Sequence, residues 1–275
     1  VACIAILIVL NLRGVRESVI ALAPVFILFL ATHAILIGGG LLATFTRWDD
    51  TAVEVGRGFS GGASAIGIGG MLLLFVHAYS LGGGTYTGIE AVSNGVAIMR
   101  EPKVETAKRT MVYMGTSLAV TASGLLLCYL LWNVRAVDGK TMNAVFAERF
   151  IETVPLGMAF VVLTLLSEGA ILVVAAQAGF VDGPRVLANM AVDSWVPRRF
   201  AALSDRLTTQ NGILLMGVAS LGALVYTRGD VRHLVVMYSI NVFVTFSLSM
   251  LGMVRHSWSG GGERRKRHLA LFLTG

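Results

Sequence analysis

The chain has 275 residues, of which 55 % are hydrophobic and only 14 % are charged, and its mean hydropathy is +0.75. A soluble domain of this length carries far more polar surface, so the composition excludes soluble classes and predicts an all-α, polytopic membrane protein. The net charge is +6, and the two cysteines, Cys3 and Cys128, lie in separate apolar segments. Their positions predict neither a disulfide framework nor a transition-metal site.

Apolar segments follow one another along the chain. A bilayer core about 30 Å thick is crossed by roughly 20 apolar residues in a helix. The segments that approach this length, or form part of such a span, are 1–10, 18–42, 66–99, 111–132, 154–181, 212–226 and 231–254. We therefore predict a single transmembrane domain, residues 1–275, with about six full or partial spans and the start of another. Because the chain begins and ends inside apolar runs, we expect it to be a piece of a longer protein.

The basic residues of the connecting loops predict an orientation. If the loop 11–17 is cytoplasmic, strict alternation of the spans places 15 of the 22 Lys and Arg residues inside and the other seven outside. Lys and Arg near the ends of spans are retained on the cytoplasmic side. The bias explains the positive net charge without a nucleic-acid partner. We expect a multi-pass protein of a bacterial plasma membrane, with a homodimer as a candidate assembly.

Cysteine labelling is expected to report this orientation. Single cysteines introduced at positions 102–106 of the full-length protein should be shielded from an impermeant thiol reagent applied outside the cell. Cysteines at positions 138–140 should be labelled, because that loop is predicted to lie on the opposite side of the membrane. A variant without the native cysteines provides the background. The reverse labelling pattern would overturn both the orientation and the numbering of the helices.

The segment 66–99 is too long for one straight span and is polar at its centre, where residues 79–95 read YSLGGGTYTGIEAVSNG. Its three consecutive glycines, Gly82, Gly83 and Gly84, cost a continuous helix on the order of 2–3 kcal/mol relative to alanines. We predict a break there between half-helices 66–81 and 85–99. Irregular backbone at this depth survives only inside protein or beside a water-filled cavity. Such breaks bind substrates and ions in secondary transporters, although a glycine hinge that serves packing alone is the alternative.

Glu90 lies in the second predicted half-helix, and Thr87 lies about one turn before it on the same face. A lone carboxylate at membrane depth costs roughly 2.5–3.5 kcal/mol on insertion scales, so it is expected to face a cavity. The alternative is a structural glutamate that bonds two helices together. Glu168, in the sequence LLSEGAIL, has two equal interpretations, which are proton relay and helix pairing.

The other polar residues of the spans are weaker signals. His33 and His77 are expected to be packing residues, because nothing near them has the spacing of a metal site. Tyr238, Ser239 and Asn241 lie in a late span, where they either bond neighbouring helices or line a cavity. The chain has no HExxH motif, no CxxC motif and no P-loop lysine after its glycines, so neither an enzyme nor a bound cofactor is expected.

Several stretches together resemble the amino acid–polyamine–organocation (APC) superfamily. They are GGGTYTGIEAVSNG (82–95), MREPKVETAKRTM (99–111), LNLRGVRES (10–18) and GFVDGPRVLANMAVDSWVPRRFAALSDRLTTQNGILLMG (179–217). Within the superfamily they most resemble the KimA-type potassium importers of the KUP family. The resemblance implies a LeuT-like fold with two inverted repeats and a broken sixth helix. This chain would then hold the complete second repeat and lack the first three helices.

The resemblance also implies a site. KimA-like proteins bind potassium with a threonine and a glutamate one turn apart on the sixth helix and a tyrosine on the tenth, which Thr87, Glu90 and Tyr238 match. The resulting candidate ion-binding residues are Gly82, Gly83, Gly84, Thr85, Thr87, Glu90 and Tyr238. Glu90 and Glu168 are the candidates for proton coupling. The implied function is proton-coupled potassium uptake, with potassium and protons as partners. The alternative function is an amino acid permease, because the same break can receive the carboxylate and the ammonium group of an amino acid.

Overall fold

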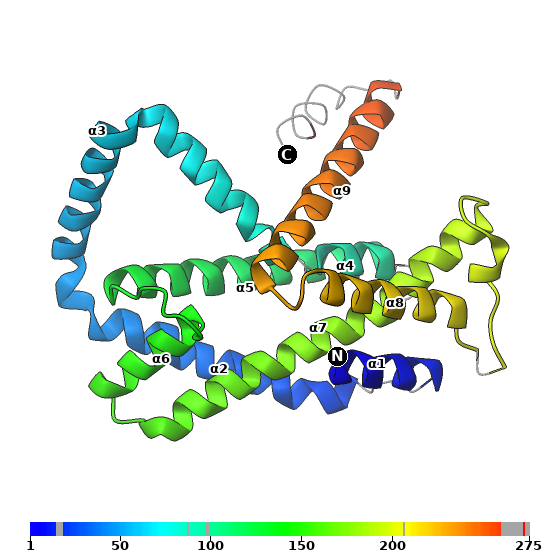
Figure 1. Ribbon diagram of the computed structural model, residues 1–275, viewed down its shortest axis with the longest axis horizontal. Coiled ribbons are helices and arrows are strands. Elements are labelled where there is room, and N and C mark those ends of the chain that lie inside the picture. Colours follow the sequence, from blue (N-terminus) through cyan, green and yellow to red (C-terminus); the bar gives the residue numbers. More distant parts are fainter. Residues whose placement is uncertain (15–18, 87, 97–98, 206, 260–271, 273–275) are drawn as a thin grey trace. The chain divides into compact units, whose positions relative to one another are not determined.

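The computed structural model describes residues 1–14, 19–86, 88–96, 99–205, 207–259 and 272, and no strand occurs among them. Its α-helices are α1 (Ala2–Leu12), α2 (Val19–Ala43), α3 (Trp48–Leu81), α4 (Ile89–Gly95), α5 (Lys103–Leu131), α6 (Met142–Thr153), α7 (Gly157–Val192), α8 (Gln210–Tyr226) and α9 (Val231–Ser259) (Figure 1). The short 3-10 helices are η1 (Phe45–Arg47), η2 (Gly82–Tyr86) and η4 (Arg198–Phe200). The predicted all-α class is confirmed for this part of the chain.

Within the described residues, five helical segments are long and apolar enough to cross a membrane. They are Ala23–Ala43, Phe45–Gly84, Lys103–Leu131, Gly157–Val192 and Val231–Trp258. The shorter apolar helices α1 and α8 coincide with the predicted partial span at the start of the chain and with the predicted short span at 212–226. The protein is therefore a multi-pass integral membrane protein, as its composition predicts.

Helix α3 begins earlier than the sequence analysis predicts. The apolar segment was expected to start at residue 66, but α3 starts at Trp48 and carries Asp49 and Asp50 in its first turn. Carboxylates in that position are favourable, because they face the positive end of the helix dipole. The helix kinks at Gly67, whose φ of 71° and ψ of 165° are not helical. The predicted start of the span thus coincides with a kink inside a longer helix.

The predicted break at the three glycines is confirmed. The α-helix ends at Leu81, and residues Gly82–Tyr86 form the 3-10 helix η2. Gly88 then has a φ of 102°, which L-amino acids with a side chain rarely adopt, and α4 begins at Ile89. The second half-helix is shorter than the predicted 85–99, because α4 ends at Gly95. The glycine at position 88 delays its start.

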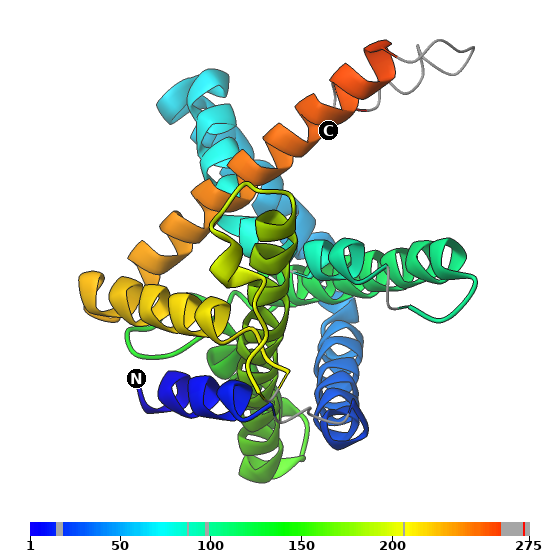
Figure 2. The ribbon, with the colours of Figure 1, turned by 90° about the vertical axis from the view of Figure 1, so that its right-hand side faces the viewer.

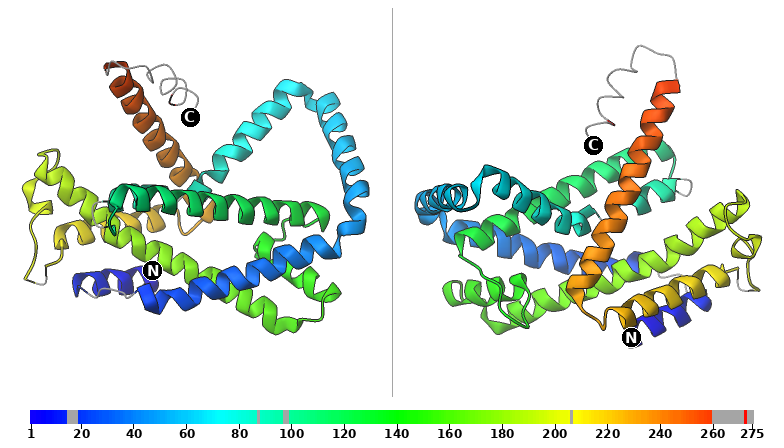
Figure 3. Two further views of the ribbon diagram at one scale, coloured as in Figure 1. Left: turned by 180° about the vertical axis from the view of Figure 1, so that it is seen from behind. Right: turned by 45° about the horizontal axis from the view of Figure 1, so that its top comes forward.

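The chain divides into two compact units. Unit 1 comprises residues 1–65 and 88–222, and unit 2 comprises residues 66–87 and 223–275. In unit 1, α7 is the central helix and contacts α1, α2, α4 and α6. Figure 3 allows α2, α5 and α7 to be followed through this unit.

The main apolar core of unit 1 lies where α2, α5, α6 and α7 meet. Phe146 and Phe150 of α6 are fully buried there, together with Leu36 and Cys128. Helix α2 approaches α6 closely, since a Cβ on Gly40 would lie only 2.7 Å from Cζ of Phe146. The aromatic rings of α6 therefore fill space that a glycine on α2 leaves open.

A second apolar cluster joins α1, α7 and α8 in unit 1 (Figure 2). Leu7, Phe180 and Ile213 are its buried members. Beside them, Asn11 and Gln177 pair through their side-chain amides, with N···O distances of 2.8 and 3.2 Å. The two buried amides satisfy each other, so α1 is held on α7 in a fixed register.

Candidate functional site

The glycine break packs against α9 inside unit 2, where η2 and α9 are in contact (Figure 3). Gly83 is buried, and a Cβ on it would lie 3.2 Å from Cε2 of Phe243 and 3.6 Å from Oγ of Ser239. A Cβ on Gly84 would lie 3.9 Å from Cε1 of Tyr238. Two of the predicted glycines and the predicted tyrosine are thus brought together. The absence of side chains at 83 and 84 lets the backbone of the break come close to α9.

An aromatic wall lies beside this contact. The rings of Tyr79 and Phe243 have centroids 6.0 Å apart, and the rings of Phe75 and Tyr79 lie 6.4 Å apart in a stacked arrangement. Tyr79 comes just before the break, and Phe243 lies one helical turn after Ser239 on α9. Phe243 and Ser239 therefore both lie against Gly83, and the Tyr79 ring lies beside that of Phe243.

The predicted threonine and glutamate pair cannot be placed. Thr87 lies outside the described residues. Thr85 belongs to η2 and Glu90 to α4, but only their backbones are among the described features. The roles of these three residues therefore stay predictions.

Ser239 is a residue that the sequence analysis undervalued. The residue is 4 % exposed, and its Oγ has no hydrogen-bond partner within the described part of the chain. The sequence gives one weak signal, which is that Ser239 directly follows Tyr238 in a span. The contact with Gly83 joins residues far apart in the chain, so periodicity alone does not predict it.

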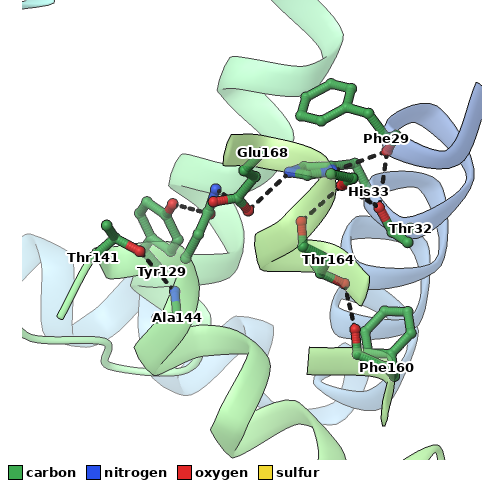
Figure 4. A network of polar contacts seen from close by, with 11 residues as sticks. Phe29, Thr32, His33, Tyr129, Thr141, Ala144, Phe160, Thr164 and Glu168 are labelled. Atoms are coloured by element: carbon green, nitrogen blue, oxygen red, sulfur yellow. Dashed lines mark hydrogen bonds and ion pairs between the residues drawn. The ribbon is translucent and has the colours of Figure 1, made fainter. Parts of the chain in front are cut away.

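A second polar cluster surrounds Glu168 in unit 1 (Figure 4). The Glu168 carboxylate on α7 accepts a hydrogen bond from Nδ2 of Asn143 on α6 at 3.0 Å. The same oxygen, Oε1, lies 3.3 Å from Nε2 of His33 on α2. The Asn143 amide oxygen in turn accepts a hydrogen bond from the hydroxyl of Tyr129 on α5. Glu168 therefore links four helices, as the helix-pairing interpretation predicts.

The His33 ring is held in one orientation. It is 3 % exposed, it packs on the Phe29 ring at a centroid distance of 3.9 Å, and its Nδ1 lies 2.9 Å from the carbonyl oxygen of Phe29. A carbonyl only accepts, so Nδ1 carries a hydrogen. On the same side of the ring, the Thr32 hydroxyl lies 3.4 Å from Nδ1 of His33 and 3.4 Å from the Ser167 hydroxyl. The packing role expected for His33 is thus combined with a polar one.

The contact between His33 and Glu168 is compatible with two arrangements of hydrogens. With Nδ1 protonated, Nε2 faces the carboxylate either as an N–H donor or as a bare lone pair. The first case is an imidazolium beside a carboxylate, and the second requires a protonated Glu168 that donates to the lone pair. Without a proton on Nε2 or on the carboxylate, the Nε2 lone pair and an anionic oxygen would face each other at 3.3 Å. The proton-relay interpretation of Glu168 stays a prediction.

One enzyme-like pattern in the chain is accounted for by its helix. Residues 58–62, GFSGG, match the GxSxG pattern of serine hydrolases. That chemistry requires the serine on a sharp turn between a strand and a helix. Ser60 instead lies within α3 and donates to the carbonyls of Gly56 and Arg57.

A multi-pass helical protein whose broken span packs its glycine turn on a later span has the features of a membrane permease. The chain belongs to the amino acid permease family, whose model matches residues 1–274. It is also similar to the potassium transporter KimA of Bacillus subtilis (strain 168), with 34 % identity over 251 residues. That match covers 91 % of this chain and 40 % of the relative, so the chain spans about two fifths of the relative's length. The predicted APC-type, KimA-like relationship is confirmed, as is a permease-type protein rather than an enzyme.

Proposed function

We propose that the full-length protein is a secondary transporter that imports potassium together with protons across a bacterial plasma membrane. The observation that carries the proposal is the 3-10 turn Gly82–Tyr86, which interrupts an apolar span and packs against Tyr238 and Ser239. Backbone of this kind persists at membrane depth where it lines a polar site. The likeness to a potassium transporter supports potassium as the substrate.

The proposed architecture is the second repeat of a LeuT-like fold. In this assignment α3 and α4 form the broken sixth helix, and α1 and α2 are the fourth and fifth. The whole chain belongs to one transmembrane domain, and the homodimer remains part of the proposal. Further ligands would come from helices that precede this chain in the full-length protein.

The chemistry of the break suits a large monovalent cation. Potassium sheds water in exchange for several oxygen ligands, which carbonyls and hydroxyls supply. A cation in a low-dielectric site also needs a negative partner, and Glu90 is the proposed one. Residues 58–99 and 233–254 contain no Lys or Arg, and Glu90 is the single carboxylate in these two stretches. The local charge therefore favours a cation over an anion.

Proton coupling is assigned to two carboxylates, Glu90 and Glu168. Glu90 would respond directly to the cation, since a bound cation favours its charged form and desolvation favours its neutral form. Glu168 would hold the proton that it shares with His33, and the surrounding groups are Asn143 and Tyr129. A change in that proton alters contacts to α2 and α6 together, which is a route to conformational coupling.

The alternative function is amino acid uptake, which the name of the matching family favours. The deciding experiment uses the full-length protein in a bacterium that lacks its own potassium uptake systems. Growth at low potassium and uptake of rubidium into vesicles are expected, while labelled amino acids should not accumulate. Amino acid uptake without rubidium uptake would replace the potassium proposal.

A further inference from the structure

We propose that the Ser239 hydroxyl is a ligand of the transported cation at the glycine break. This inference rests on the proposed function and deepens it, because it adds a residue from α9 to the candidate site. Tyr238 is the residue that the resemblance places there, and Ser239 is the next residue along the helix.

The hydroxyl of Ser239 departs from the behaviour of other serines in this chain. A serine within a helix commonly donates to the carbonyl three or four residues before it. Ser80, Ser123 and Ser249 do so, with O···O distances of 2.7, 2.5 and 2.9 Å. Ser239 is more buried than these three serines, yet its Oγ makes no hydrogen bond within the described residues. A buried hydroxyl without a partner is unfavourable, so its position calls for a ligand.

The direction of the hydroxyl identifies the place where that ligand binds. Ser239 faces the break, since the Cβ position of Gly83 lies 3.6 Å from Oγ and 3.7 Å from Cα of Ser239. Phe243 closes the next turn of α9 with its ring edge 3.2 Å from the same position. The hydroxyl thus lies beside Gly83 of the 3-10 turn, with the Phe243 ring one turn further along α9.

The charge of the surroundings decides the kind of ligand. A hydroxyl can accept from an ammonium, donate to a carboxylate or coordinate a metal cation. The stretches 58–99 and 233–254 carry no Lys or Arg, so an anion would lack a counter-charge from either element. Neutral hydroxyl and carbonyl oxygens are the ligands that potassium prefers in membrane proteins. The hydroxyl is therefore assigned to the cation.

The test is rubidium uptake by the full-length protein with Ser239→Ala and Ser239→Thr. Ser239→Ala is expected to raise the apparent KM for rubidium by about five- to tenfold, the size of one neutral oxygen ligand, with little change in the maximal rate. Ser239→Thr keeps the oxygen and is expected to restore most of the affinity. Ser249→Ala is the matched control, because this exposed serine of the same helix bonds only to its own backbone.

Thermal unfolding of the purified protein separates a ligand from a packing residue. Without potassium, Ser239→Ala should unfold at the same temperature as wild type or higher, because the variant removes an unpartnered buried hydroxyl. Added potassium should stabilise wild type more than the variant. An unchanged KM in an active transporter, or an equal loss of stability with and without potassium, would overturn the ligand role alone. A wild-type protein that takes up no rubidium would overturn the proposed function itself.

Discussion

Rubidium uptake by the full-length protein is expected to fall by roughly 10- to 100-fold when Glu90 is replaced by glutamine, the range of a lost bond to a charged group. Glutamine has nearly the same shape as glutamate but carries neither its charge nor its proton. A cation in a site of low dielectric then loses its negative partner. The residual uptake is also expected to lose its pH dependence. Initial rates in energised vesicles, measured between about pH 5.5 and 8.5, report both effects.

Two further variants serve as comparisons for Glu90→Gln, one at a neutral candidate ligand and one at an exposed carboxylate. Thr87→Val removes one neutral oxygen and is expected to weaken the apparent affinity by about 1 kcal/mol, or roughly fivefold. Glu101→Gln removes an exposed carboxylate that pairs loosely with Lys103 at 3.6 Å, and it should leave uptake unchanged. Protein levels in the membrane must match in all variants. Wild-type rubidium rates and pH profile in Glu90→Gln would refute the cation assignment and favour an amino acid permease.

The spans and the break were predictable because both depend on local properties of the sequence. An apolar run is long enough to cross a bilayer or it is not, and three adjacent glycines weaken any helix in which they occur. The extension of α3 back to Trp48 was not predictable in this way. Its residues include Asp49, Asp50 and several glycines, a composition that is typical of a loop. A helix forms there nonetheless, so the composition of this stretch was misleading.

The candidate site was predictable only in part, for a different physical reason. Periodicity shows which residues share a face of one helix, but it does not show which helices meet. His33 and Glu168 are 135 positions apart, so neither residue indicates the other in the sequence. Ser239 likewise becomes a candidate site residue only through its contact with Gly83, which the sequence does not indicate. The resemblance placed Tyr238 in the site at the break, and the sequence named Glu168 as a candidate for proton coupling, whereas the contact of Glu168 with His33 required the three-dimensional arrangement.

Glu168→Gln is expected to keep the fold and to flatten the pH dependence of uptake while leaving a measurable rate. With its amide nitrogen in the place of Oε1, glutamine can donate to Nε2 of a neutral His33, at the cost of the bond that Asn143 donates to the same oxygen in the wild type. The variant therefore imitates the protonated state of the cluster and cannot release the proton. Glu90→Gln differs, because it removes most of the uptake itself. The two variants thus separate loss of a cation ligand from loss of a titrating group.

Glu168→Ala is the structural counterpart of this variant. It leaves Nε2 of the buried His33 and Nδ2 of the half-buried Asn143 without their carboxylate partner, and an unsatisfied buried group costs about 1–3 kcal/mol. Its unfolding temperature should fall clearly below those of wild type and Glu168→Gln. Unfolding scans of the purified proteins and pH profiles of rubidium uptake would be measured side by side. If Glu168→Gln retains the wild-type pH profile, the cluster only ties α2, α6 and α7 together, and proton coupling belongs to another group.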